Sequence, residues 1–164
     1  MGLDITACSK IERITDLEKV ENGDYSTNVR RTHPEFERAS DIDEGYYDCV
    51  GEIYRFRAGS YSGYNFFRNT LSKAILGESA ENVWEKDDEF KGKPMYEIIN
   101  FSDCEGNIGP AVSKKLHKDF MENREKFVNY IKEFDEPNFY ERIYDDFTKG
   151  FELASNEQGI LIFH

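Results

Sequence analysis

In the stretch Gly159-Ile160-Leu161-Ile162-Phe163-His164, four consecutive apolar residues come directly after Gly159, a residue typical of turns. A short apolar run of this kind is typical of a strand that is covered on both faces. We therefore expect residues 159–163 to form a strand of a small sheet. The elements that pack around this strand are found by reading outward from it.

Three segments carry apolar residues at helical spacing. Pro110 suits the first position of a helix, and the pattern that follows it predicts a helix over 110–133. A second amphipathic helix is expected over 138–155. A third is expected over 62–76, because Gly77 is typical of a helix end.

Strands are predicted where β-branched and aromatic residues alternate with polar ones, over 3–8, 46–49 and 52–57. Strands early in the chain, helices late and a final strand indicate an α+β fold. We expect a small, mainly antiparallel sheet that includes 3–8, 52–57 and 159–163. About three helices cover one side of it.

Other segments give weaker signals. Residues 10–45 and 78–94 show little hydrophobic period, so we expect irregular excursions there, with no more than a short helix or a single helical turn in each. Residues 95–101 are apolar and short, and they fit either a strand or a helix end.

Length and charge restrict the class of protein. With 164 residues the chain suits a single domain over 1–164. A net charge of −12 disfavours direct nucleic-acid binding. No apolar run is long enough for a membrane span. An odd number of cysteines without a C-x-x-C pair indicates a reducing compartment, so we expect a cytoplasmic protein of unknown oligomeric state.

The segment RAGSYSGYN, residues 57–65, is the first candidate site, since it lies where a predicted strand passes into a predicted helix. Backbone N–H groups and the helix dipole favour anions at such a junction. Arg57 offers a forked positive charge, and Tyr61 offers a ring that stacks on a base. The hydroxyls of Ser60 and Ser62 and the amide of Asn65 complete this candidate site.

A structural interpretation of the same segment is also open. Gly59 and Gly63 would then only permit the turn. One of the serines would cap the helix, and the tyrosines would pack in the core.

The second candidate is the polar segment 100–109, which precedes the helix expected from Pro110. Asp103 and Asn107 would bond hydroxyl or amine groups of a ligand. An EF-hand calcium loop that begins at Asp103 needs a glutamate at its twelfth position, where the chain has Lys114. The three histidines have no metal-ligand spacing, so we predict no metal site.

Motifs for common chemistries are absent. Tyr61 occupies the centre of 59–63, where a nucleophile elbow requires serine. There is no P-loop and no dinucleotide fingerprint, so no cofactor is expected. Cys104 precedes a helix start, but the acidic residues on either side of it disfavour a thiolate.

Four segments carry a resemblance to a known family: MGLDITA (1–7), FRAGSYSGYN (56–65), INFSDCEGNIGP (99–110) and the terminal FH. In these segments the chain resembles a family of small proteins encoded by bacteriophages and prophages. The resemblance implies a phage-type protein made in a bacterial host cytoplasm. It implies no particular activity.

Three functions remain open at this stage. The first is binding of a small anionic or nucleotide-like ligand where 57–65 and 100–109 meet, which would sequester a host signal. The second is an acidic protein that inhibits a host nucleic-acid-binding or defence enzyme, with acid-rich patches at 85–89 and 133–146. The third is an enzyme of unknown reaction, for which no nucleophile–base set is visible.

Overall fold

The computed structural model describes residues 2–31 and 38–164. Its larger sheet has the strand order β5-β1-β7-β6 and its smaller sheet the order β2-β4-β3, with every neighbouring pair antiparallel. The larger sheet consists of β5 (Ile53–Ser60), β1 (Gly2–Cys8), β7 (Ile160–Phe163) and β6 (Gly106–Ile108). The smaller sheet consists of β2 (Ile11–Arg13), β4 (Gly45–Cys49) and β3 (Thr27–Val29).

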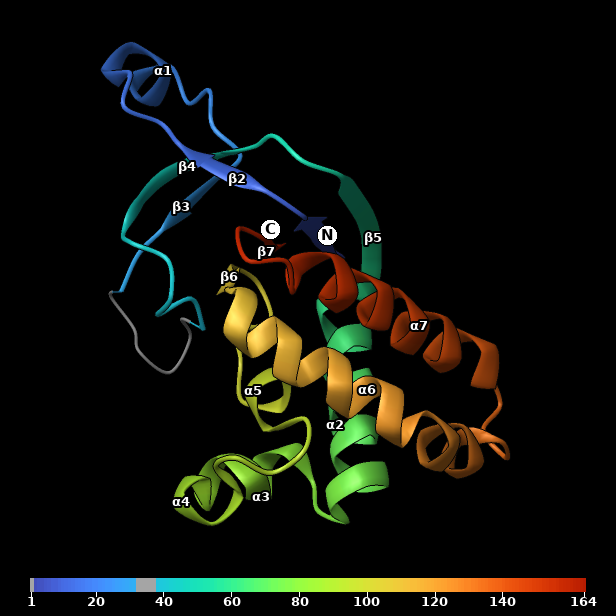
Figure 1. Cartoon of the computed structure of the whole chain (residues 1–164). Helices are drawn as coiled ribbons and strands as arrows, with labels where there is room; N and C mark the ends of the chain where they lie inside the picture. Colours follow the sequence, from blue (N-terminus) through green and yellow to red (C-terminus); the bar gives the residue numbers. More distant parts are fainter. Residues whose placement is uncertain (1, 32–37) are drawn as a thin grey trace.

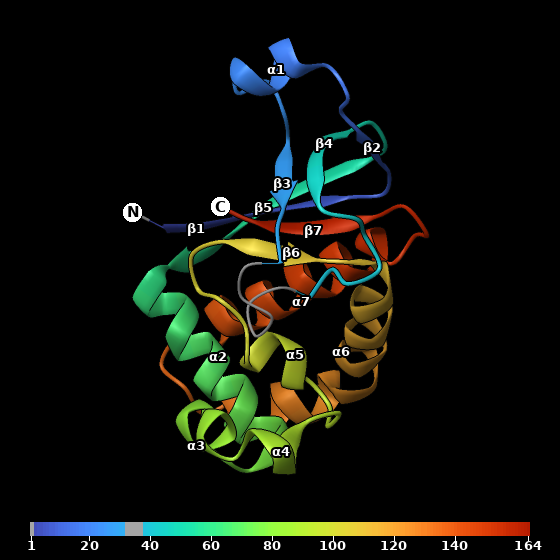
Figure 2. The same ribbon diagram turned by 90° about the vertical axis from the view of Figure 1, so that its left-hand side faces the viewer.

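The elements form three layers, with the larger sheet between the helices and the smaller sheet (Figure 1, Figure 2). The long helices are α2 (Tyr61–Leu76), α6 (Pro110–Ile131) and α7 (Pro137–Ala154). The short ones are α1 (Leu17–Glu21), α3 (Ala80–Glu85), α4 (Asp87–Phe90) and α5 (Tyr96–Ile99). The expected α+β class is confirmed. The smaller sheet covers the second face of the larger sheet, which the sequence did not predict.

Strand β7 is central and is buried on both faces, as its apolar run predicts. Leu161 and Phe163 belong to the hydrophobic cluster on the helix side, which we call the helix face. Ile160 and Ile162 belong to the cluster under the smaller sheet, which we call the sheet face. Successive side chains of a strand point to opposite sides, so this one segment contributes to both clusters.

Aromatic rings dominate the helix face. Phe147 of α7 is fully buried, and the centre of its ring lies 5.0 Å from that of Phe56 and 5.8 Å from that of Phe67. Each buried ring removes on the order of 150 Å² from water, so this cluster supplies most of the hydrophobic stabilisation.

The two sheets are joined at a corner where the chain leaves β1 and enters β2. Cys8 is the last residue of β1, and Cys49 is the last residue of β4. The N–H groups of residues 50 and 51 both donate to the Lys10 carbonyl oxygen, at 2.9 and 3.1 Å. Backbone pairing therefore continues around the corner from one sheet to the other.

Two segments differ from the sequence-based expectation. Segment 10–45 contains β2, α1 and β3, and segment 78–94 contains α3 and α4. Residues 32–37 of the first segment lie outside the described residues. The expectation allowed a short helix in 10–45, where α1 lies, but it missed β2 and β3, because strands of three residues leave no period to detect.

Two further details complete the fold. The apolar segment 95–101 contains the short helix α5, and the polar segment 100–109 contains β6, which was not predicted as a strand. Within the described ranges, no helix combines the length and apolar character needed to cross a bilayer.

Candidate functional site

The stretch 57–65 is a strand-to-helix junction whose polar groups bond mainly within the chain. The Ser60 hydroxyl accepts a hydrogen bond from the Gly63 N–H at 3.0 Å, so Ser60 is the N-cap of α2. Arg57 is exposed, and its Nε lies 3.8 Å from a carboxylate oxygen of Asp4 on strand β1. These contacts stabilise the junction without a ligand.

The other three predicted residues of this stretch lie in different surroundings. Ser62 is exposed and contacts the Ser60 hydroxyl at 3.1 Å. Tyr61 packs against the helix-face cluster. Asn65 reaches the second predicted segment, because its Nδ2 donates to Oδ2 of Asp103 at 2.7 Å. The two candidate segments therefore meet at Asn65 and Asp103.

A cleft of about 1020 Å³ opens beside this meeting point. Residues 25–30, which include β3, form one wall, and residues 100–107 form the other. The end of β7, Arg68 of α2 and Trp84 of α3 complete the lining. In Figure 2, β3 descends from the smaller sheet toward β6, so the cleft lies where the two sheets approach each other. Its volume lies at the upper end of the range for small-molecule sites.

Only part of the predicted site lines this cleft. Asp103 and Asn107 belong to its lining. The lining does not include the predicted residues of the 57–65 stretch, which are Arg57, Ser60, Tyr61, Ser62 and Asn65. Asn65 nevertheless contacts the cleft residue Asp103 through a hydrogen bond.

Arg68 is the most unusual polar residue of the cleft, because only 6% of it is exposed. Its terminal nitrogens donate to the Phe101 carbonyl oxygen and to the Asn65 side-chain oxygen. The guanidinium carbon lies 4.8 Å from the ring centre of Trp84 and 5.5 Å from that of Tyr64. The side chain is thus clamped between α2, α3 and the 100–107 segment.

The charge of Arg68 has no direct counter-ion in the described part of the chain. No carboxylate oxygen there lies within 4 Å of it, and Asp103 reaches it only through Asn65. Its Nε–H is buried with no acceptor among the same residues. A buried cation without a paired anion is costly, and an anionic group placed beside it would lower that cost.

Asn107 joins the two walls of the cleft. Its Oδ1 accepts a hydrogen bond from the Thr27 hydroxyl at 2.8 Å, and its Nδ2 donates to the Asn28 carbonyl oxygen at 3.3 Å. Only 4% of Asn107 is exposed. The sequence predicted this residue as a ligand contact, and the structure places its amide in a bridge between β6 and β3.

Aromatic side chains supply the apolar part of the cleft. Trp84 is 43% exposed, and its indole N–H donates to the Ile99 carbonyl oxygen at 2.9 Å, which fixes the plane of the ring. Tyr25 lines the opposite wall, with its ring centre 4.8 Å from that of Tyr46. Rings held in this way offer stacking surfaces at low entropic cost.

His164 lies at the cleft end of β7. Its Nε2 is 3.0 Å from the Thr6 hydroxyl, and its backbone N–H donates to the Asp4 carbonyl oxygen. Burial lowers the pKa of His164; Asp4 raises that pKa in part, and Arg55 lowers it further. The imidazole is therefore neutral at pH 7 and serves as an uncharged hydrogen-bonding group.

Cys104 is exposed on the 100–107 segment, and its sulfur lies 3.4 Å from the Ser102 hydroxyl. That hydroxyl also accepts from the backbone N–H groups of Cys104 and Glu105, both at 3.2 Å. These bonds shape the turn. Within residues 2–31 and 38–164, no group of three His, Cys, Asp or Glu side chains is placed to hold a metal ion.

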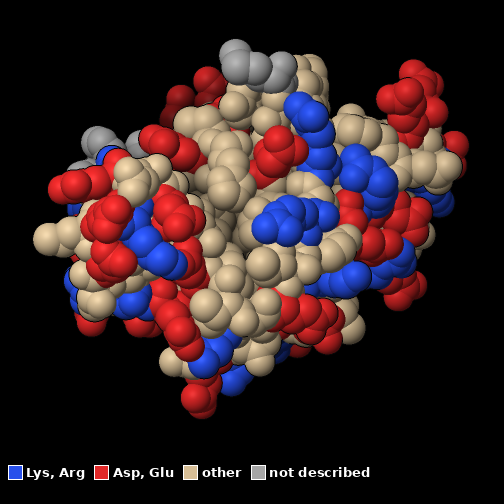
Figure 3. Space-filling view, turned by 90° about the horizontal axis from the view of Figure 1, so that it is seen from above, with Lys and Arg blue, Asp and Glu red and all other residues tan. Residues whose placement is uncertain are grey.

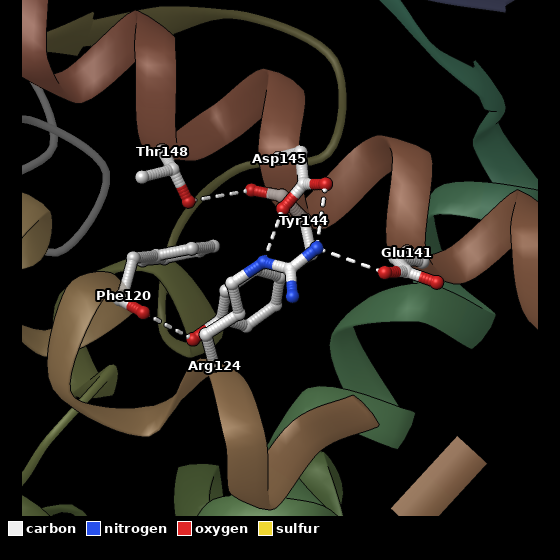
Figure 4. A network of polar contacts seen from close by, with 6 residues as sticks. All are labelled: Phe120, Arg124, Glu141, Tyr144, Asp145 and Thr148. Atoms are coloured by element: carbon white, nitrogen blue, oxygen red, sulfur yellow. Dashed lines mark hydrogen bonds and ion pairs between the residues drawn. The ribbon is translucent and has the colours of Figure 1, made fainter. Parts of the chain in front are cut away.

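The acid-rich segment 133–146 is partly neutralised by its own helices. Arg124 of α6 makes two hydrogen bonds of 2.9 Å to Asp145 and one of 2.8 Å to Glu141 (Figure 4). Arg142 pairs with Asp146 at 2.9 Å. On the face seen in Figure 3, acidic and basic side chains are interleaved. A partner drawn by charge alone would find no uniform acidic patch on this face.

Comparison of the chain with protein-family models, with curated proteins and with solved structures finds no match. The resemblance to phage-encoded proteins therefore stays a prediction. The function has to be argued from the cleft.

Sequence reasoning missed Arg68 and Trp84, although the chain held a signal for Arg68. Residue 68 lies four positions after Tyr64 and three before Leu71, on the apolar stripe of the predicted helix. A charged residue on a buried stripe is rare unless its charge is used. Trp84 gave no comparable signal, because its neighbours are charged and its helix has only six residues.

Proposed function

We propose that this protein binds a small anionic, nucleotide-like ligand in the cleft between β3 and the 100–107 segment. The observation that carries the proposal is Arg68, a buried guanidinium that lines the cleft, has no carboxylate within 4 Å in the described chain and keeps one N–H without an acceptor. A phosphate or carboxylate of the ligand supplies the missing acceptor and the missing negative charge.

The remaining lining suits the other parts of such a ligand. A flat ring packs against the exposed part of Trp84 or against Tyr25. Asp103 and Glu105 accept hydrogen bonds from hydroxyl or amino groups. These two carboxylates also repel a long polyanion, which fits the net charge of −12 and favours a small ligand over a nucleic-acid strand.

The function that follows is capture without chemistry. No nucleophile and base are hydrogen-bonded to each other in the described cleft lining. In the phage setting that the sequence predicts, such a protein would hold a host nucleotide signal and lower its free concentration.

The direct test is calorimetric titration of the full chain with AMP, GMP, cyclic di-GMP and inorganic phosphate, with thermal denaturation in parallel. We expect at least one nucleotide to bind at micromolar concentration and to raise the melting temperature. Inorganic phosphate should bind more weakly because it lacks a ring. No heat and no shift with any probe at millimolar concentration would overturn the proposal.

Two arginine variants distinguish this site from the one that the sequence predicts. Arg68→Lys keeps the charge but loses the forked geometry, and we expect it to weaken nucleotide binding at least tenfold, since a hydrogen bond to a charged group contributes about 1.5–3 kcal/mol. Arg57→Lys is the matched control and should leave affinity unchanged. The reverse ranking would place the anion at the 57–65 junction.

A second variant, Trp84→Ala, tests the same site if Arg68→Lys does not fold. Trp84→Ala removes a side chain that is 43% exposed, so it should fold normally, as checked by circular dichroism. We expect weaker binding of nucleotides and unchanged binding of phosphate. An unchanged nucleotide affinity would remove the ring from the proposed binding mode.

A further inference from the structure

Two cysteines meet inside the corner that joins the sheets. Ile11 of β2 lies directly opposite Cys49 of β4 in the antiparallel register. Side chains at directly opposite positions point to the same face of a sheet. Ile11 and Cys8 are both buried in the sheet-face cluster, and Cys49 packs against that cluster. The corner thus turns both sulfur atoms toward the same interior.

The Lys10 carbonyl oxygen contacts both the Cys8 sulfur and the backbone N–H of residue 50, which follows Cys49, at 2.9 Å each. The Cys49 S–H donates to the Cys8 sulfur, which lowers the pKa of Cys8 and raises that of Cys49. Burial opposes the shift at Cys8, while backbone N–H groups at the corner support it. When the pair is neutral, the Cys8 thiol donates instead to the Lys10 carbonyl oxygen at 2.9 Å. Loss of one proton therefore places the negative charge on Cys8.

We propose that Cys8 and Cys49 form a reversible disulfide that closes the corner between the two sheets. The oxidant is a low-molecular-weight disulfide. Cys49 is the partly exposed member of the pair, so its sulfur attacks first. As it attacks, its proton passes by way of Cys8 to the small thiolate that leaves, so a mixed disulfide forms on Cys49, one small thiol is released and Cys8 remains a thiolate. The Cys8 thiolate then attacks the Cys49 sulfur and releases the second small thiol.

The reaction is balanced. The two protein thiols give up two protons and two electrons, and the small disulfide takes them up as two thiols. Cys8 is fully buried, so a small oxidant reaches it only through Cys49. The order of attack is therefore set by exposure, and the second step is set by the thiolate character of Cys8.

The location gives the bond a structural consequence. A Cys8–Cys49 disulfide ties the end of β1 to the end of β4, and β4 pairs with both other strands of the smaller sheet. In a reducing compartment such a bond forms only when small disulfides accumulate. The pair would then report the redox state of its surroundings.

The test uses the full chain incubated with oxidised glutathione at neutral pH, followed by thiol blocking, intact-mass measurement and peptide mapping. We expect a mass loss of about 2 Da, since forming one disulfide removes two hydrogens. Free thiols should fall from the three cysteines of the sequence to Cys104 alone, and dithiothreitol should reverse the change.

Two variants make the result specific. Cys104→Ser should still lose the same mass, because Cys104 takes no part. Cys49→Ser should show no such loss. A stable glutathione adduct on Cys49, a bond that includes Cys104, or unchanged thiols in the wild-type chain would each overturn the proposal.

Discussion

The two faces of the larger sheet are built differently. The helix face is covered by α2, α6 and α7 through large rings such as Phe67, Phe147 and Phe151. The sheet face is covered by a small three-stranded sheet through smaller side chains, and buried polar bonds such as that between Thr27 and Asn107 help to hold it. Hydrophobic stabilisation grows with the apolar area buried, so the helix face contributes most of the stability.

The difference explains where the cleft lies. Rings on the helix face interdigitate, and such packing leaves few voids. On the sheet face, hydrogen bonds hold two strands side by side without filling the space around them, and the cleft opens there. The proposed disulfide lies on this second face, and the proposed ligand site lies at its edge, where Arg68 of α2 and Trp84 of α3 also line the cleft.

The largest expected effect tests the helix face. Phe147→Ala removes a fully buried ring and should lower the free energy of unfolding by about 3–5 kcal/mol, through lost burial and the cavity left behind. Urea denaturation measures it. The control is Phe66→Ala on α2, where the ring is 65% exposed and the change should stay within about 0.5 kcal/mol. Equal losses in the two variants would contradict the division between the faces.

A smaller effect is expected at the bridge between the sheets. Asn107→Ala leaves the buried Thr27 hydroxyl without its partner and should cost about 1–3 kcal/mol. Hydrogen exchange should speed up in β3 and remain unchanged in α6. Asn28→Ala is the control, because the bridge uses only the backbone carbonyl of that residue. Faster exchange throughout the helices would show that the faces are not separable.

The junction at the start of α2 should give a still smaller effect. Ser60→Ala removes the helix cap and should cost about 1 kcal/mol, whereas Ser62→Ala two positions later should cost only a few tenths. Chemical denaturation of both variants compares them. If Ser62→Ala were the more harmful, the capping role of Ser60 would be wrong.

The smallest effect concerns pH at the end of β7. Because burial lowers the folded-state pKa of His164 below its ordinary value of 6.5, the unfolded chain takes up the proton first as pH falls. Stability is therefore lost as pH falls from about 6.5 toward the lowered folded pKa. Denaturation between pH 7.5 and 5 should show a shallower slope for His164→Asn than for wild type. Equal slopes for His164→Asn and wild type would contradict this role of His164.

Much of the helix face was predictable from the sequence. The helices expected over 62–76, 110–133 and 138–155 match α2, α6 and α7 to within about two residues, because apolar residues at helical spacing are a local signal. The strands that build the core of the larger sheet were found for the same reason. On the sheet face only β4 was predicted, as a strand over 46–49, and β2 and β3 were missed because strands of three residues carry no period.

The candidate site was predicted only in outline. The expectation that 57–65 and 100–109 lie close together holds at Asn65 and Asp103. The expected anion contact, Arg57, lies away from the cleft lining, and Arg68 lies in it. Spacing along the chain shows that a junction has free N–H groups. It does not show which side chain the neighbouring layer will bury.

By itself, the sequence determined the class of fold, the long helices and the doubly covered final strand, because each depends on a hydrophobic pattern within a single segment. Only the tertiary structure decided the second sheet, the cleft, the burial of Arg68 and the meeting of Cys8 with Cys49. Each of these depends on groups far apart in the chain, and their energies arise only once the layers have packed together.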